Sequence, residues 1–182
     1  ARKGRPAVGS DPVGLFVGRH DNPIDKKGRV SIPAPFRAAL GEPVKSIYVF
    51  PTVDPKRECI VVWSYAEMER LGEKMRRGFR GMSDQERRTA MLAVRAARQV
   101  TVDENGRMQI PADMAKALGI RDIATFVGDG LYCTIWAPAR FDAEMDQLLS
   151  ARFEGADDVL MGLISTDGDD AQRGPAMEGV DA

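Results

Sequence analysis

An aspartate and an arginine stand four residues apart, with a glycine between them, at two places in this 182-residue chain. The two sets are Asp25, Gly28 and Arg29, and Asp103, Gly106 and Arg107. Glycine takes the positive φ that a tight turn needs, so each carboxylate should meet its guanidinium across a turn and brace it. An arginine stiffened in this way can also donate two hydrogen bonds to a phosphate or to the edge of a guanine. Both uses of the arginine stay open at this point.

The two aspartates could instead form an acid–base pair of carboxylates, but little else in the chain points to catalysis. His20 is the only histidine, and the sequence has no His/Cys cluster at metal-ligand spacing. Neither glycine turn resembles a phosphate cradle, because a strand and not a helix is expected after it. We therefore predict that the chain is not an enzyme and that it binds no metal and no cofactor.

The two sets belong to an internal duplication. Residues 24–41 and residues 102–119 are identical at nine of eighteen positions, and the copies stay in step up to Trp63 and Trp136. Self-similarity of this kind determines the architecture of the whole chain. The chain should therefore contain two copies of one unit of roughly fifty residues.

Each copy has the same expected order of elements. Alternating polar and apolar residues after the turn predict a strand, and an Ile-Pro-Ala step then starts a short helix that ends at Gly41 or Gly119. Ser64 and Ser83 begin capping boxes and predict a pair of antiparallel helices, at about 65–79 and 84–99. Aromatic residues such as Trp63 and Trp136 could stack on bases, but their apolar surroundings favour core packing. The expected division is a flexible arm at 1–14, a first module at 15–66, a helical pair at 67–99, a second module at 100–140, a C-terminal helix at 141–153 and an acidic tail without structure at 154–182.

Composition narrows the class of protein. The net charge is −1, but residues 1–140 hold 24 Lys and Arg against 16 Asp and Glu, whereas residues 141–182 hold 2 against 11. A basic body with an acidic tail suggests a polyanionic partner, although solvated basic helices would give the same pattern. No apolar run approaches a membrane span, so we expect no membrane partner and a cytoplasmic location. There, Cys59 and Cys133 should remain reduced and buried.

The two copies differ in the charge of their turns. The first turn reads Lys26, Lys27, Gly28 and Arg29, whereas the second reads Glu104, Asn105, Gly106 and Arg107. We expect nucleic acid at the first copy and a role in assembly, or a weaker contact, at the second. The candidate DNA-binding residues are Arg19, Lys26, Lys27, Arg29, Arg37 and Arg107, and the candidate turn-bracing residues are Asp25, Gly28, Asp103 and Gly106.

An Asp-x-x-Gly-Arg turn followed by a strand, Ile-Pro-Ala and a short helix ending in Leu-Gly resembles the swapped-hairpin module of AbrB/SpoVT-type DNA-binding proteins. Two such modules in one chain resemble the MraZ family, over about residues 15 to 150. The resemblance implies a mixed α+β, β-rich fold, with two tandem modules forming one pseudo-symmetric, barrel-like core and helices after each module.

The same resemblance implies a bacterial regulator of transcription, usually a repressor. It would bind direct repeats in the promoter of a division and cell-wall gene cluster that includes its own gene, as a homo-oligomeric ring associated with the nucleoid. Double-stranded DNA would be the partner, and the family's arginine corresponds to Arg29 and Arg107. Two alternatives stay open: an antitoxin-like AbrB relative, and a ring-forming scaffold for other proteins.

Overall fold

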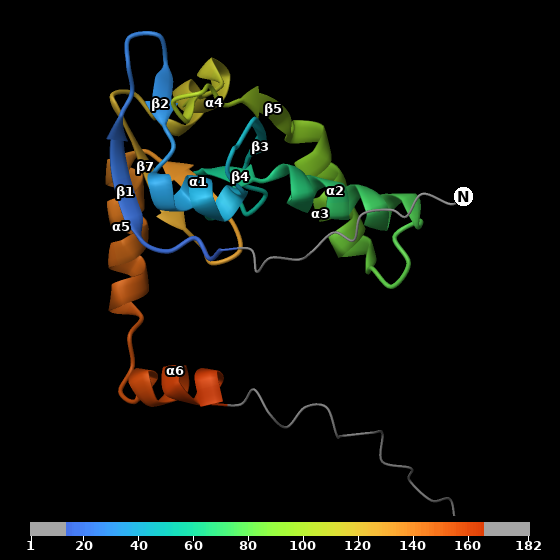
Figure 1. Ribbon diagram of the computed structural model, residues 1–182. Helices are drawn as coiled ribbons and strands as arrows, with labels where there is room; N and C mark the ends of the chain where they lie inside the picture. The colour runs from blue at the N-terminus through green and yellow to red at the C-terminus, as the bar shows by residue number, and fades with distance from the viewer. Residues whose placement is uncertain (1–13, 166–182) are drawn as a thin grey trace, which may run out of the picture. The chain divides into compact units, whose positions relative to one another are not determined.

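The computed structural model describes residues 14–165, and side chains up to Leu163. The chain divides into two compact units, Ala1–Glu144 and Met145–Ala182. The first unit contains both copies of the repeat (Figure 1). The expected arm at 1–14 and the end of the acidic tail lie almost wholly outside the described residues.

The two copies fold into the same succession of elements. The first copy contains β1 (Arg19–Pro23), β2 (Arg29–Ser31), α1 (Ala34–Leu40), β3 (Ser46–Pro51) and β4 (Ile60–Trp63). The second contains β5 (Arg98–Thr101), β6 (Arg107–Gln109), α4 (Ala112–Leu118), β7 (Ile123–Gly128) and β8 (Cys133–Trp136). Gly41 and Gly119 end α1 and α4 in the left-handed conformation, as the sequence predicts.

The copies exchange their first strands. β1 of the first copy pairs with β7 of the second, and β5 of the second pairs with β3 of the first. The six-stranded antiparallel sheet therefore has the order β1-β7-β8-β4-β3-β5, which is the same arrangement of equivalent strands from either end. β2 and β6 pair with each other in a separate two-stranded sheet. Each copy thus contributes half of one shared structure.

The six-stranded sheet does not continue through its own strand pairs into the expected barrel. Among residues 14–165, β1 and β5 are the two ends of the sheet, and no strand pairing joins them. β2 and β6 could not extend the ladder far, because each is three residues long and is soon followed by Pro33 or Pro111. A proline lacks the N–H that a central ladder needs. The fold is therefore mixed α+β, and only the single bridges Ile24–Val30 and Val102–Met108 link the β2–β6 pair to the ends of the six-stranded sheet.

The middle helices are shorter than the sequence predicts. Both capping boxes form, at the starts of α2 (Tyr65–Arg76) and α3 (Asp84–Ala96). The sequence predicts that α3 reaches Gln99, but the backbone is extended at Ala97 and the next residues join β3 as strand β5. Pairing with a distant strand here outweighs the local helix preference.

The core draws on both copies. Phe16, Phe36 and Phe126 are almost fully buried and meet edge to face, with ring centroids 5.5 and 6.5 Å apart. Trp136 is also buried, and the half-buried Trp63 packs against Phe50, so the expected core role of the aromatics is confirmed. Cys59 and Cys133 are buried and form no disulfide, as expected. Burial raises the pKa of the Cys59 thiol to about 12.

The second unit contains the end of α5 (Pro138–Ser150) and α6 (Ala156–Ser165). α6 lies in the segment 154–182, for which the sequence predicts no structure, and this prediction is wrong for α6. The prediction rests on the acidic composition of the whole segment. It overlooks the apolar residues that follow Asp157 and Asp158, including Val159 and Leu160. Two carboxylates in the first turn of a helix interact favourably with its dipole. Residues 166–182 lie outside the described residues.

Candidate nucleic-acid interface

Asp25 holds the first turn together. Its Oδ1 accepts hydrogen bonds from the backbone N–H groups of Lys27 and Arg29, both at 2.9 Å. Its Oδ2 lies 2.8 Å from Nε and 2.7 Å from Nη2 of Arg29. The backbone N–H of Gly28, which has φ of 76°, donates to the carbonyl of Asp25 at 2.9 Å. The carboxylate thus fixes both the turn and the arginine that follows it.

The second turn repeats these bonds almost atom for atom. Oδ1 of Asp103 accepts from the N–H groups of Asn105 and Arg107 at 2.9 Å, and its Oδ2 lies 2.9 Å from Nε of Arg107. The N–H of Gly106, with φ of 72°, donates to the carbonyl of Asp103 at 2.8 Å. Both arginines are half-buried, with side chains 35% exposed.

The bonds stabilise the charged form of each carboxylate. The backbone N–H of Arg29, followed by its guanidinium, lowers the pKa of Asp25 to about 2. The backbone N–H of Arg107 is the main cause that lowers the pKa of Asp103, and its guanidinium adds to the effect. Hydrogen bonds to an ionised carboxylate favour that form. Both turns are therefore braced by a carboxylate that is charged at neutral pH.

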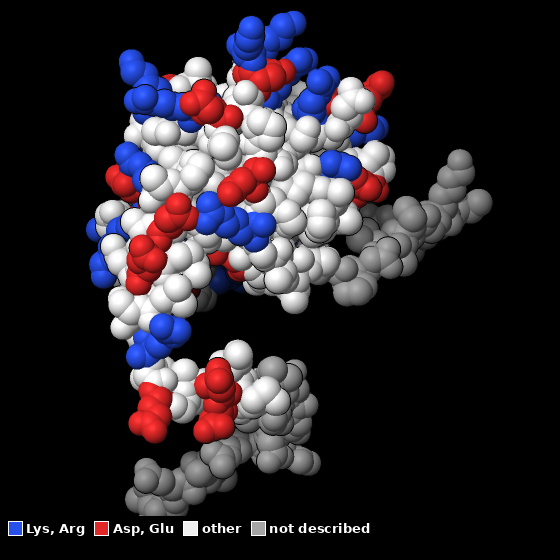
Figure 2. Space-filling model, turned by 90° about the vertical axis from the view of Figure 1, so that its left-hand side faces the viewer, with Lys and Arg blue, Asp and Glu red and all other residues white. Residues whose placement is uncertain are grey.

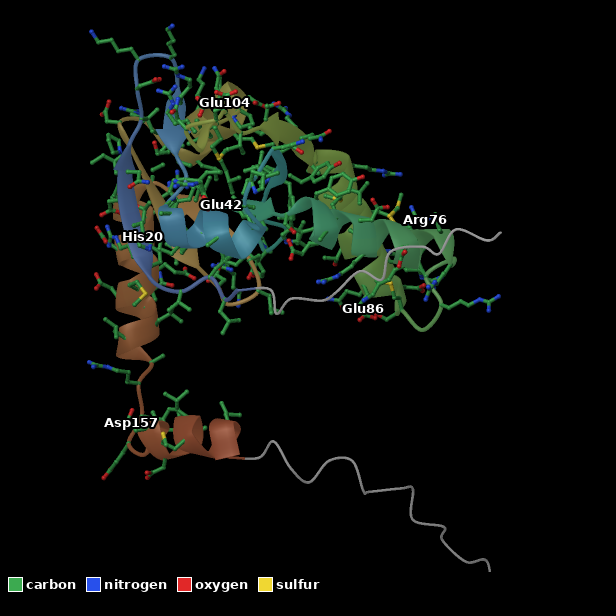
Figure 3. The ribbon with its side chains drawn as sticks, viewed as in Figure 1. His20, Glu42, Arg76, Glu86, Glu104 and Asp157 are labelled. Carbon is green, nitrogen blue, oxygen red and sulfur yellow. The ribbon has the colours of Figure 1, made fainter. Side chains whose placement is uncertain are left out.

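The turns differ in the two side chains at their tips. Lys26 and Lys27 are exposed, and neither takes part in an ion pair among the described residues. Their counterparts, Glu104 and Asn105, give the second turn no positive charge. Lys and Arg side chains project at the upper end of Figure 2, with Asp and Glu side chains among them, and Figure 1 places the β1–β2 turn at this end. Glu104 is labelled near α4 in Figure 3.

Each turn is also hydrogen-bonded to residues of the other copy of the repeat. The N–H of Ile32 donates to the carbonyl of Gly106 at 2.9 Å, and the N–H of Ile110 donates to the carbonyl of Gly28 at 3.3 Å. Nε2 of Gln109 donates to the carbonyl of Lys27 at 3.1 Å. These bonds fix the two turns beside the β2–β6 pair and make the candidate interface part of the shared structure.

One of the candidate residues lies far from both turns. Arg19, at the other end of β1, is bonded to Asp21 and to Asp142 (2.5 Å) and lies over the ring of Phe141. Along a strand, the six residue-to-residue steps from Arg19 to Asp25 span roughly 20 Å. Arg19 therefore belongs to the contact between β1 and α5 and not to the first turn.

Arg37 belongs to the second turn, although it is part of the first copy. Its Nη1 donates to the carbonyl of Ile32 at 2.7 Å, and its Nε donates to Glu42 at 2.8 Å. The side chain crosses Gly106 so closely that an added Cβ there would lie 2.5 Å from Cδ of Arg37. Arg37 thus covers the turn that has no lysines at its tip, and its own charge is paired.

A groove runs beside each turn. The groove beside the first turn, of about 410 Å³, is lined by Lys27 together with Lys116 and Arg121 of the second copy. The groove beside the second turn is larger, about 640 Å³, and brings Arg37 and Lys45 together with carboxylates. Lys116 and Arg121 are missing from the residues that the sequence singles out. The repeat in the sequence relates Lys116 and Arg121 to the first copy. Only the exchange of strands, however, brings these two residues to the first turn.

The middle helices carry a cluster of basic residues of their own. Lys74, Arg76, Arg77 and Arg80 surround a cavity at the turn between α2 and α3. Arg76 pairs with Glu69 at 3.3 Å. Figure 3 places Arg76 well away from Glu104, so this basic cluster is distinct from the second turn.

Comparison with known proteins identifies the family. The sequence model of the MraZ protein family, described as antitoxin-like, matches residues 15–90 and 93–162. The chain belongs to the MraZ family. The match to MraZ covers both copies of the repeat and extends into α6.

Curated MraZ relatives agree with this assignment. The transcriptional regulator MraZ of Rickettsia bellii (strain OSU 85-389) is 35% identical over 142 residues, which is 77% of this chain and 91% of the relative. The proteins of the same name from Rickettsia peacockii (strain Rustic) and Rickettsia canadensis (strain McKiel) are 30% identical over 131 residues and 27% identical over 143 residues. These matches cover 71% and 78% of this chain, and 86% and 94% of the two relatives.

No helix among residues 14–165 is both long enough and apolar enough to cross a membrane. The same residues contain no group of three or more His, Cys, Asp and Glu side chains that could hold a metal ion. His20 packs edge to face on Phe36, with ring centroids 5.1 Å apart.

Proposed function

We propose that the chain is a transcriptional regulator that binds double-stranded DNA through its first turn. The observation that carries the proposal is the pair of exposed lysines, Lys26 and Lys27, beside an arginine that its own turn holds in place. The names of the MraZ relatives support the regulatory role. The proposal assigns the chain no catalytic step and no cofactor.

The three cations would have different tasks. Lys26 and Lys27 contact phosphates, which position the protein on the duplex but carry no sequence information. Arg29 reads a base edge. Its Nε and one hydrogen of Nη2 face Asp25, so among the described bonds Nη1 and the other hydrogen of Nη2 are left as a pair of donors for the base. Arg107 is braced in the same way but has no lysines beside it, so it would contribute a weaker contact or a contact within an assembly.

A turn with so few cations binds DNA weakly by itself, and its binding is sensitive to salt. We propose that the chain assembles into a homo-oligomeric ring that presents several such turns to direct repeats. Linking the contacts in this way can raise affinity by about 10²- to 10⁴-fold. The exchange of β1 and β5 within one chain would correspond to the swapped hairpins of single-module relatives. It would leave other surfaces available for the ring.

The target would be the promoter of the protein's own gene, within a division and cell-wall gene cluster, and the usual outcome would be repression. This activity would place the protein in the cytoplasm, at the nucleoid. An antitoxin-like relative or a ring-forming scaffold is the alternative, and a scaffold would show no preference for this promoter.

The test is a titration of the full chain against two duplexes of equal length. One duplex carries the region upstream of the protein's own gene, and the other carries a random sequence of the same composition. We expect tighter binding to the upstream duplex and affinity that falls steeply as salt is raised. Equal affinity for the two duplexes throughout the salt series would refute a sequence-specific regulator.

A further inference from the structure

The groove beside the first turn brings together cations from both copies of the repeat. Its lining includes Ile24 and Lys27 from the first copy, and Lys116, Ile120 and Arg121 from the second. Lys116 and Arg121 are exposed, and neither takes part in an ion pair among residues 14–165. The groove lining includes no carboxylate.

The strand exchange explains why residues so far apart in sequence meet here. Because β1 pairs with β7, Pro23 lies opposite Ile123, and the N–H of Ile24 donates to the carbonyl of Asp122 at 2.8 Å. The loop between α4 and β7 is thereby fixed beside the base of the first turn. Lys116 lies in the last turn of α4, where a cation also complements the helix dipole.

The groove beside the second turn occupies the equivalent place but has a different charge. Its lining includes the carboxylates of Glu42, Asp103 and Glu104 and the cations Arg37 and Lys45. Arg37 is already paired with Glu42. Lys116 corresponds to Ala38 in the first copy, so that cation is absent from the second groove. The two grooves therefore share a position beside a turn but differ in the charge of their linings.

We propose that Lys116 and Arg121 join Lys27 in a phosphate-binding groove that holds the DNA backbone beside the bases read by Arg29. The inference rests on the proposed function and deepens it, because each DNA contact then needs both copies of the repeat. The first copy supplies the reading turn and its lysines, and the second supplies two further phosphate contacts, Lys116 and Arg121. Neither copy can build this surface alone.

The experiment uses the full chain and the two duplexes described above, over a series of salt concentrations. The test variant is Lys116→Ala with Arg121→Ala, and the matched control is Lys45→Ala, which removes an exposed cation from the second groove. We expect the double variant to bind both duplexes about two- to tenfold more weakly, with the salt dependence reduced by about one phosphate contact for each residue. The preference for the upstream duplex should survive, because phosphate contacts do not read sequence. Lys45→Ala should match the wild type.

Unchanged affinity and salt dependence in the double variant would overturn the inference, as would an equal loss in Lys45→Ala. Thermal unfolding of each variant checks the fold, and Lys116→Gln with Arg121→Gln repeats the test with longer polar side chains. Failure of the proposed function would look different. The wild-type protein would then show no preference between the duplexes. Its affinity for the random duplex, compared with that of the double variant, would still show whether Lys116 and Arg121 bind phosphate.

Discussion

The two turns have the same hydrogen-bonded frame and different charges. In both, one aspartate accepts two backbone N–H bonds at 2.9 Å and binds the arginine four residues later. The two tip positions contribute to this frame only through the backbone. Their side chains are therefore free to differ, as Lys26 and Lys27 in one copy and Glu104 and Asn105 in the other. The same frame of Asp, Gly and Arg is thus compatible with the DNA contact proposed for the first turn and with a purely structural role for the second.

What lies over each turn differs as well. Arg37 crosses Gly106 at close range and is held there by Ile32 and Glu42. Gln109 approaches Gly28 more loosely, with Nε2 3.8 Å from where a Cβ would lie. The second turn is thus covered by a paired arginine, while the first opens onto a groove lined with cations.

The largest expected difference is between Arg29→Ala and Arg107→Ala. Both substitutions remove the same brace from the same frame, so any general loss of turn order affects both variants. Only Arg29→Ala also removes the proposed base contact, which is worth about 1–3 kcal/mol at each site and compounds across an oligomer. In titrations against the upstream and random duplexes, Arg29→Ala should lose the preference, while Arg107→Ala keeps most of it.

Arg29→Lys sharpens this comparison, because lysine keeps the charge but cannot donate in a bidentate manner. It should retain binding to the random duplex and lose the preference for the upstream duplex. Equal loss of preference from Arg29→Ala and Arg107→Ala, with the fold intact, would contradict the division between the turns.

The two glycines should differ in a smaller but measurable way. Both have positive φ, so alanine costs about 1–2 kcal/mol of strain at either position. At Gly106 the new Cβ would also meet Cδ of Arg37, whereas at Gly28 it meets nothing closer than 3.8 Å. Chemical denaturation should therefore show a greater loss of unfolding free energy for Gly106→Ala than for Gly28→Ala.

A double-mutant cycle identifies the cause of that difference. In a background of Arg37→Ala the obstruction is gone, so the cost of Gly106→Ala should fall to that of Gly28→Ala. A difference that persists without Arg37 would show that the two turns differ for another reason.

The smallest expected effect is in the titration of the two carboxylates. The native pKa of Asp25, about 2, is below its usual value of 3.8, so the stabilising bonds are fully present above that usual value. They are lost as the pH falls from about 4 through 2. In an NMR titration of the side-chain carboxyls, Arg29→Ala should raise the pKa of Asp25 and leave Asp103 unchanged, and Arg107→Ala should do the reverse. A shift of both carboxylates by either substitution would mean that the turns are coupled.

Much of the local structure can be predicted from the sequence. Asp25, Gly28 and Arg29 define their turn through contacts within five residues, and Ser64 and Ser83 define helix starts in the same way. Such short-range bonds depend only on nearby side chains. The residue pattern alone is therefore enough to predict the turn frame and the capped helix starts correctly.

The partners of the strands cannot be predicted in this way. Alternation indicates which face of a strand is buried but not which strand lies beside it. Pairing with β3 makes Arg98 and Gln99 part of a strand, where the sequence predicts a helix end. The exchange of strands also places Lys116 and Arg121 at the first turn, and an ion pair with Asp142 ties Arg19 to α5. Each of these outcomes depends on contacts between residues far apart in the sequence.

The most direct test of the central claim is a chemical footprint of the lysines on the wild-type chain. A reagent that modifies exposed amines is applied with and without the upstream duplex, and the modified sites are counted by mass spectrometry. We expect DNA to protect Lys26 and Lys27, while Lys45 beside the second turn and Lys56 react to the same extent with and without DNA. Protection of Lys45, with Lys26 and Lys27 still reactive, would place DNA at the second turn and contradict the account.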